Sequence, residues 1–203
     1  MSTIPLHGNE PPSGWVQRWS HLVRPGGTVL DVACGGGRHL AWFAARGHGV
    51  TGVDIDTRAA SVQVPGARLV EADIEQGPWP LAGADGAPET FDAVVVTNYL
   101  WRPLWGTLLS CLAPGGVLIY ETFAIGNETV GRPARPGFLL QRAELLQVCA
   151  GLHTVAFEDG CLEQPARFVQ RIAAVRGQPG QPGQPGQPGQ PGQPPALPAV
   201  YLL

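Results

Sequence analysis

Short apolar runs alternate with segments of helical composition along most of the chain. Five runs rich in β-branched residues predict strands at residues 28–33, 50–55, 67–74, 91–98 and 116–123. The runs are almost continuously apolar, as strands buried on both faces of a parallel sheet require. Residues 37–46, 56–63 and 101–112 have helical composition. This alternation predicts a doubly wound sheet of the α/β class.

The pattern changes on either side of these five runs. Residues 13–23 place Trp15, Trp19 and Leu22 at helical spacing behind Ser13, which predicts a capped helix whose tryptophans pack into the core. After the fifth strand come a long loop at 124–138 and a helix at 141–150. Two further strands, at 152–158 and 166–175, are expected to form an antiparallel pair.

A repeat marks the end of the folded region. Six Gly-Gln-Pro triplets run from Gly177 to Pro194, with almost nothing to bury and a proline at every third position. Such a segment favours extended backbone without a core. We predict a flexible N-terminus at 1–12, one domain at 13–176 and a disordered tail at 177–203. A collagen-like helix is the less favoured interpretation of the tail, because a triple helix needs a longer run.

Composition excludes several classes of protein. The 203 residues are 44% hydrophobic with a formal net charge of −3, and all basic residues are scattered arginines. No apolar run approaches the roughly 18 residues that span a bilayer, and the first residues do not resemble a targeting peptide. We therefore predict a cytoplasmic protein without membrane or nucleic-acid partners. The four cysteines show no paired spacing, so neither a disulfide framework nor a metal site is expected.

The first predicted strand leads into a glycine-rich turn. Residues 28–38 read Thr-Val-Leu-Asp-Val-Ala-Cys-Gly-Gly-Gly-Arg, and a helix follows directly. Such a turn lets the backbone approach a ligand closely. The dinucleotide pattern Gly-x-Gly-x-x-Gly fails, because Leu40 stands at its last glycine. The Walker pattern fails as well, because the chain contains no lysine.

Three successive strands are predicted to end near a carboxylate. Asp31 precedes the glycine turn, Asp54 closes the second strand 23 residues later, and Asp73 closes the third. Open α/β sheets bind ligands at this edge, and an acid such as Asp54 can accept hydrogen bonds from ribose hydroxyls. An acidic rim repels phosphates but suits a nucleoside with a cationic tail. S-adenosylmethionine has that charge distribution.

With these motifs in order, and Pro-Gly-Gly at 114–116 before the fifth strand, residues 13–176 resemble the class I S-adenosylmethionine-dependent methyltransferases. The resemblance implies a Rossmann-like, doubly wound seven-stranded sheet, mostly parallel with the last strand antiparallel, in three layers. It implies S-adenosyl-L-methionine as cofactor. The cofactor contacts that it implies are Asp31, Ala33, Cys34, Gly35, Gly37, Asp54, Ile55, Asp73, Ile74 and Asn98. Ala33 departs from the family pattern, which has glycine there.

Some of these residues have a simpler interpretation beside the functional one. Asp73 can equally be a capping or solvated acid, and Asp56 is better interpreted as a helix N-cap than as a ligand. Cys34 is interpreted as a small packing residue, because nothing beside it marks a nucleophile.

Candidates for the acceptor side follow the fourth and fifth strands. Tyr99 is predicted to orient a nucleophile and Glu121 to accept a proton, although both can instead satisfy neighbouring backbone groups. The loop at 124–138 is a possible lid, with Arg132 and Arg135 available to an anionic acceptor, although ordinary surface arginines are the favoured interpretation. The arrangement of this loop before the Phe-Leu-Leu-x-x-x-Glu-Leu segment at 138–145 resembles small bacterial methyltransferases of the tellurite-resistance type.

We therefore predict a methyltransferase that acts on a small-molecule acceptor, as a monomer or homodimer. No Asn-Pro-Pro-Tyr type motif follows the fourth strand, which argues against methylation of nucleic-acid bases or of protein glutamine. Methyl transfer depends mainly on alignment, so no catalytic base need be visible. The alternative is a non-catalytic nucleoside-binding protein of the same fold, and a NAD-type oxidoreductase is a more distant one.

Overall fold

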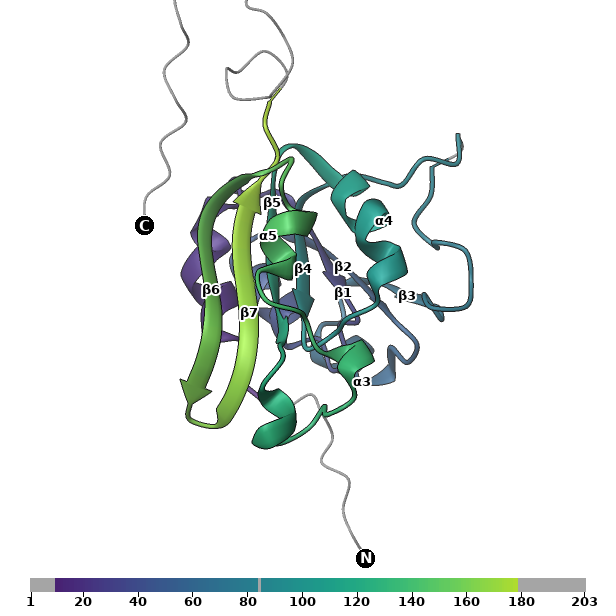
Figure 1. Ribbon diagram of the computed structural model, residues 1–203. Helices are drawn as coiled ribbons and strands as arrows, with labels where there is room; N and C mark the ends of the chain where they lie inside the picture. Colours follow the sequence, from purple (N-terminus) through teal and green to yellow (C-terminus); the bar gives the residue numbers. More distant parts are fainter. Residues whose placement is uncertain (1–9, 84, 179–203) are drawn as a thin grey trace, which may run out of the picture.

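The computed structural model describes residues 10–83 and 85–178 and contains one seven-stranded sheet with the order β3-β2-β1-β4-β5-β7-β6 (Figure 1). The parallel strands are β1 (Thr28–Val32), β2 (Gly49–Asp54), β3 (Arg68–Glu71), β4 (Phe91–Thr97) and β5 (Leu112–Phe123). β7 (Ala166–Val175) runs antiparallel to both β5 and β6 (His153–Glu163). The predicted fold class is confirmed. Most of the predicted N-terminal segment and tail lies outside the described residues.

Helices cover both faces of the sheet (Figure 1). α1 (Gly14–Trp19), α2 (Arg38–Ala44) and α3 (Arg58–Gln63) pack on one face, and α4 (Trp105–Ser110) and α5 (Glu144–Val148) on the other. Short 3-10 helices lie in the connections: η1 (Ser20–Leu22), η2 (Arg102–Leu104), η3 (Asn127–Thr129) and η4 (Pro136–Phe138). No helix in residues 10–83 and 85–178 is both long and apolar enough to cross a membrane.

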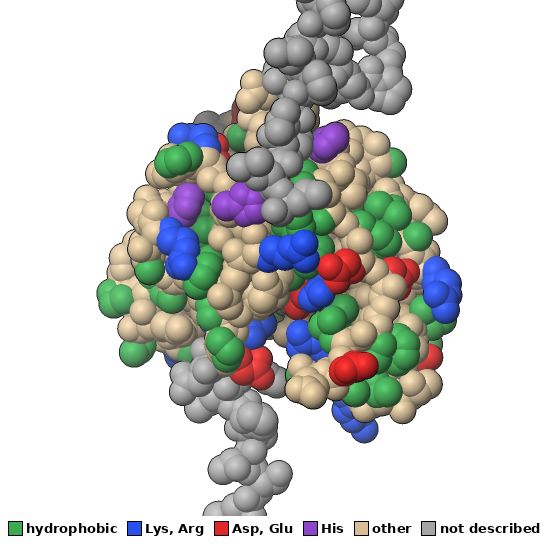
Figure 2. Space-filling model, turned by 90° about the vertical axis from the view of Figure 1, so that its left-hand side faces the viewer, with side chains coloured by type: hydrophobic (Ala, Val, Ile, Leu, Met, Phe, Trp, Pro, Cys, Tyr) green, Lys and Arg blue, Asp and Glu red, His purple; other side chains and the backbone are tan. Residues whose placement is uncertain are grey.

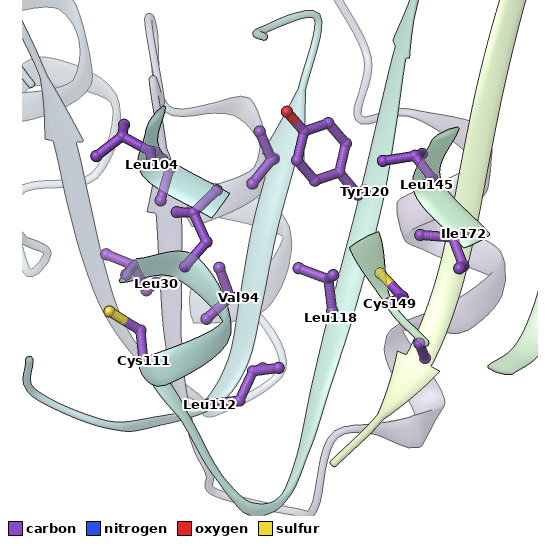
Figure 3. Packing of buried hydrophobic residues seen from close by; sticks show 14 of the residues in the cluster. Leu30, Val94, Leu104, Cys111, Leu112, Leu118, Tyr120, Leu145, Cys149 and Ile172 are labelled. Carbon is purple, nitrogen blue, oxygen red and sulfur yellow. The ribbon is translucent and has the colours of Figure 1, made fainter. Parts of the chain in front are cut away.

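Two hydrophobic clusters result, one on each face. Along β1, Val29 faces the cluster under α1, α2 and α3, whereas Leu30 faces the cluster under α4 and α5. Figure 3 shows this second cluster, in which Leu30, Val94 and Leu118 extend from neighbouring strands and Leu145 lies beside Tyr120 and Ile172. Successive side chains of a strand point to opposite faces. A strand that is buried on both faces therefore needs the continuous apolar run seen in the sequence.

The predicted N-terminal helix is confirmed. The Ser13 hydroxyl accepts a hydrogen bond from the backbone N–H of Trp15 at 3.1 Å. Trp15 and Trp19 are buried, and the Trp15 ring N–H donates to the carbonyl of Ile172 on β7 at 3.1 Å. Leu22 is partly buried against the same cluster. Both tryptophans are therefore core residues.

Three predicted strand boundaries are wrong: the end of β3, the start of β5, and the end of β6, which runs to Glu163 rather than residue 158. β3 ends at Glu71, because the Asp73 carboxylate accepts hydrogen bonds from the N–H groups of Glu75 and Gln76 and draws the backbone into a turn. β5 begins at Leu112 rather than residue 116, across a register shift in its pairing with β4. The helix predicted up to residue 112 accordingly ends earlier, with α4.

Candidate active site

The carboxyl ends of the five parallel strands lie at one edge of the sheet, and a cavity of about 520 Å³ opens there. Its walls come from the loop after β1, the first turn of α2, the ends of β4 and β5, and the loop at 124–138. Ala33, Cys34 and Gly35 line it from the first side, and Asn98 and Tyr99 from the second. These five residues were predicted from the sequence, and the structure brings them around one space.

The loop after β1 winds tightly around this cavity. Ala33, Gly35 and Gly37 have φ angles of 56°, 52° and 82°, in the left-handed region. Glycine adopts this conformation freely, whereas Ala33 does so at a cost of about 1–2 kcal/mol. At Gly37 a Cβ atom would also lie 3.1 Å from the Cβ of Ala60 on α3. The glycines therefore let the loop turn sharply and pack closely.

Asp54 holds this loop from the end of β2. Its Oδ2 accepts the N–H of Gly35 at 2.8 Å and its Oδ1 the N–H of Asp56 at 3.1 Å. A carboxylate has about four lone-pair positions, so two remain for hydroxyl donors such as those of a ribose. Ile55 next to it is 67% exposed, which is unusual for a large apolar side chain and suits a residue that covers a flat base. These residues fit a nucleoside.

A buried carboxylate lies beneath the loop. Asp31 is 1% exposed, and its Oδ2 has no hydrogen-bond partner among the described residues. The nearest titratable nitrogen is Nδ1 of His39, at 3.7 Å. The backbone N–H of Ser13 donates to Nε2 of His39 at 3.2 Å, which assigns the ring proton to Nδ1, facing Asp31. A buried, underpartnered carboxylate favours a cationic ligand nearby.

Tyr99 follows β4 and is held by its backbone. Its carbonyl accepts the Tyr120 hydroxyl at 2.9 Å. Burial and the neighbouring Glu75 carboxylate raise the pKa of the Tyr99 hydroxyl above its usual range. The phenol is therefore neutral at pH 7 and suits a hydrogen-bond donor better than a base. Asn98 before it is exposed, with a left-handed φ of 55° that asparagine tolerates.

Glu121 on β5 lies outside the cavity lining. It is buried, and its Oε1 accepts the Ser13 hydroxyl at 3.1 Å. Its Oε2 lies 3.3 Å from Nη1 of Arg171, and Nη2 of Arg167 lies 3.7 Å from Oε1. Both carboxylate oxygens are thus engaged with groups on α1's cap and on β7.

The other predicted contacts lie further from the cavity. Asp73 caps its own turn, and Ile74 is buried in the hydrophobic cluster on the α4 and α5 face. Phe123, in a segment that the sequence offered for the acceptor side, lines the cavity, whereas sequence reasoning missed His39 and the proline at 133. For His39 a signal existed, because it stands in the first turn directly after the glycine loop.

Comparison with known families agrees with this geometry. Residues 29–116, which span β1 to the start of β5, match the family model of a methyltransferase domain. In this match and in its fold, the chain is similar to the class I S-adenosylmethionine-dependent methyltransferases. The match agrees with S-adenosylmethionine, the cofactor predicted from the sequence.

Particular relatives include the ribosomal protein L11 methyltransferase of Burkholderia mallei, 36% identical over 115 residues, or 54% of this chain and 36% of that protein. The chain thus spans about a third of the length of such curated relatives.

Among solved structures, TehB from Haemophilus influenzae superposes with a TM-score of 0.64 at 18% identity, covering 81% of this chain and 62% of that one. The 1,6-didemethyltoxoflavin-N1-methyltransferase of Burkholderia thailandensis, with bound 1,6-didemethyltoxoflavin and S-adenosylhomocysteine, gives 0.58 at 21% identity, covering 80% and 76%. At these identities the likeness concerns the fold.

Proposed function

We propose that the chain transfers a methyl group from S-adenosylmethionine, held against the loop after β1, to a small-molecule acceptor. The observation that carries the proposal is the cavity itself, which runs from the glycine loop to the residues that end β4 and β5. A ligand on the loop and an acceptor on the far side would therefore face each other across one cavity.

When bound, S-adenosylmethionine supplies an activated methyl group, whose bond to sulfur breaks as the acceptor's lone pair bonds to carbon and S-adenosylhomocysteine leaves. In our proposal Asp54 accepts the ribose hydroxyls, and the backbone of residues 33–36 holds the amino-acid end. Asp31 lies beneath that end as a buried carboxylate with one oxygen unpartnered within the described part of the chain. Tyr99 faces the acceptor as a neutral donor, and Glu121 positions the surrounding elements through Ser13 and Arg171. Alignment and exclusion of water supply most of the rate acceleration in this chemistry.

The acceptor class rests on the shape and charge of the surface as well. On the face shown in Figure 2, arginine and acidic side chains are interspersed with hydrophobic ones, without a continuous basic area. Ion pairs such as Arg171–Glu158 and Arg68–Glu89 neutralise several arginines. A polyanion would find little to bind on such a surface. The cytoplasmic location and the monomeric or dimeric state stay predictions from the sequence.

A protein acceptor is the second candidate, favoured by the 36% identity to ribosomal protein L11 methyltransferases. The two candidates separate in one assay. The full chain is incubated with labelled S-adenosylmethionine and either a metabolite extract or ribosomal proteins, and the labelled fraction is identified. Binding without turnover on either would instead favour a non-catalytic protein of this fold.

The cofactor site is tested by calorimetric titration of the full chain with S-adenosylhomocysteine, with NADH as the negative control. Asp54→Ala should weaken binding about 100-fold, because two hydroxyl hydrogen bonds to a carboxylate contribute roughly 3 kcal/mol together. Asp85→Ala, an exposed acid that does not line the cavity, is the matched control and should bind normally. Unchanged affinity in a folded Asp54→Ala variant would refute the site assignment. Absence of binding to the folded wild-type chain would refute the function.

A further inference from the structure

A second cavity of about 310 Å³ adjoins the first. The two share the side chains that divide them: Asn98, Tyr99, Phe123 and Pro133. We call the two cavities the first and second lobes. The first lobe reaches the glycine loop, whereas the second lobe extends past Tyr99 toward Glu75 and Phe138. A nucleoside on the glycine loop would therefore leave the second lobe vacant for another molecule.

The outer wall of the second lobe is firmly held on one side by Asn127. This residue is 1% exposed, and its side-chain N–H donates to the Pro133 carbonyl at 3.0 Å. Its side-chain carbonyl accepts the N–H of Phe168 on β7 at 3.1 Å. The loop is thus fastened to the sheet next to the lobe.

Arg102 holds the other side of the same wall. Its guanidinium donates to the carbonyls of Gly137 and Leu139, each at 2.9 Å, on either side of Phe138. It also forms a two-pronged ion pair with Glu144 at 2.7 and 2.9 Å. A guanidinium with fixed partners is a rigid support. The wall of the second lobe is therefore preorganised: these hydrogen bonds fix the backbone on both sides of Phe138, although the Phe138 side chain is 46% exposed.

The lining of this lobe is aromatic with a single charge. Tyr99, Phe123 and Phe138 supply three rings, and Leu100 adds an aliphatic side chain. Glu75 is the one charged side chain among the described residues that line it, and it forms no ion pair with them. The Glu75 carboxylate acts on the Tyr99 hydroxyl, whose raised pKa reflects burial first and this charge second. Rings and an unpaired carboxylate together attract organic cations.

An anionic acceptor fits the second lobe poorly. Arg132 lines only the first lobe, and Arg135 lines neither. An acid in the second lobe would meet Glu75 without a compensating cation. The two arginines, which the sequence left available to an anionic acceptor, therefore do not serve such an acceptor in the second lobe.

We propose that the second lobe binds the methyl acceptor, and that this acceptor is a ring-sized apolar molecule that carries an amine. The inference rests on the proposed function and specifies its substrate class. The volume suits one or two fused rings beside a nucleoside in the first lobe. The amine would lie toward Glu75 and the ring against Phe123 and Phe138.

The test uses the full chain saturated with S-adenosylhomocysteine, and two matched ligand pairs observed by saturation-transfer NMR. The pairs are benzylamine with benzoate, and tryptamine with indole-3-acetate. We expect at least one amine to bind and to exceed its matched acid by about tenfold or more. Glu75→Gln should weaken amine binding about fivefold and leave S-adenosylhomocysteine affinity unchanged. Glu163→Gln, an exposed acid that lines neither lobe, is the control and should change nothing.

The outcomes separate the two levels of the proposal. An acid that binds as tightly as its amine, or a Glu75→Gln variant that binds amines normally, would overturn the substrate class. The same holds if S-adenosylhomocysteine binds but neither amine does. Failure of S-adenosylhomocysteine itself to bind would refute the proposed function instead. Phe138→Ala, an exposed ring whose loss should not unfold the chain, should weaken amine binding alone.

Discussion

Two alanines in this structure have the same unfavourable backbone conformation, and only one of them lines the cavity. Ala33 and Ala143 both have a φ of 56°, and both are half-buried. Ala33 lies in the loop after β1, whereas Ala143 precedes α5. Substitution by glycine removes the left-handed penalty of about 1–2 kcal/mol. It also adds about 0.4–1 kcal/mol of conformational entropy to the unfolded chain.

The net effect favours the folded state. The lost half-buried methyl group costs a further few tenths of a kcal/mol of stability. When both costs are subtracted from the removed backbone penalty, each glycine variant should be more stable than the wild-type chain by roughly 0.5 kcal/mol. For a domain of this size the melting temperature should rise about 1–2 °C. Urea unfolding monitored by circular dichroism measures the free energy, and thermal scans the temperature.

Ala143→Gly is the matched control, because the hydrogen bond from its backbone N–H to Asp159 at 3.1 Å does not need the methyl group. Its affinity for S-adenosylhomocysteine should equal that of the wild-type chain. A change in affinity for Ala33→Gly alone would locate the cofactor at this loop. A loss of stability in both glycine variants would refute the assigned backbone cost.

Two further predictions concern packing and charge. Gly52→Ala should destabilise the fold by about 1–3 kcal/mol, because the new Cβ would lie 2.7 Å from Leu40 and 2.8 Å from the Cys34 sulfur. Gly49→Ala on the same strand is the control, because its Cβ would meet only Thr28, at 3.8 Å. Equal thermal stability of the two variants would contradict this. Although burial opposes it, the Arg102 guanidinium lowers the pKa of Glu144. The stabilisation from this ion pair is present at pH 7 and is lost as the pH falls through the folded-state pKa of Glu144. The free energy of unfolding of Glu144→Gln should therefore be lower than that of the wild-type chain by roughly 1–2 kcal/mol at pH 7, and the difference should disappear below about pH 4. A deficit that is the same at pH 7 and pH 3 in urea unfolding would show that the ion pair is not its source.

The sequence predicted the sheet well because burial on both faces leaves a direct trace in composition. Val29 and Leu30 face opposite clusters, so the run containing them must be apolar throughout. The end of β3 left no such trace. There the Asp73 side chain decides where the strand stops, through hydrogen bonds to two backbone N–H groups. Hydrophobic patterns do not register a competition of that kind.

In the candidate site, too, the parts formed by residues close in the sequence were predictable, and the parts formed by residues far apart in the sequence were not. The glycine loop is a continuous segment, and the Asp54 that holds it closes the next strand. Strand alternation was therefore enough to place them together. The second lobe depends on hydrogen bonds between residues that are far apart in the sequence. Arg102 donates to the carbonyls of Gly137 and Leu139, which follow it by 35 and 37 positions, and Asn127 accepts from Phe168, 41 positions later. Contacts of that range follow from the folded arrangement, and single-sequence spacing does not reveal them.

The contacts of Glu121 bear on its role in the reaction. The buried Glu121 carboxylate is shared by the Ser13 hydroxyl and the guanidinium groups of Arg167 and Arg171. Such a group is better suited to positioning than to accepting a proton in each turnover. Tyr99 is held neutral by burial. With neither group acting as a base, the site suits an acceptor that exposes a lone pair once it has released a proton to water, and an amine does so near neutral pH far more readily than an alcohol. The aromatic, acidic second lobe favours the same class of acceptor.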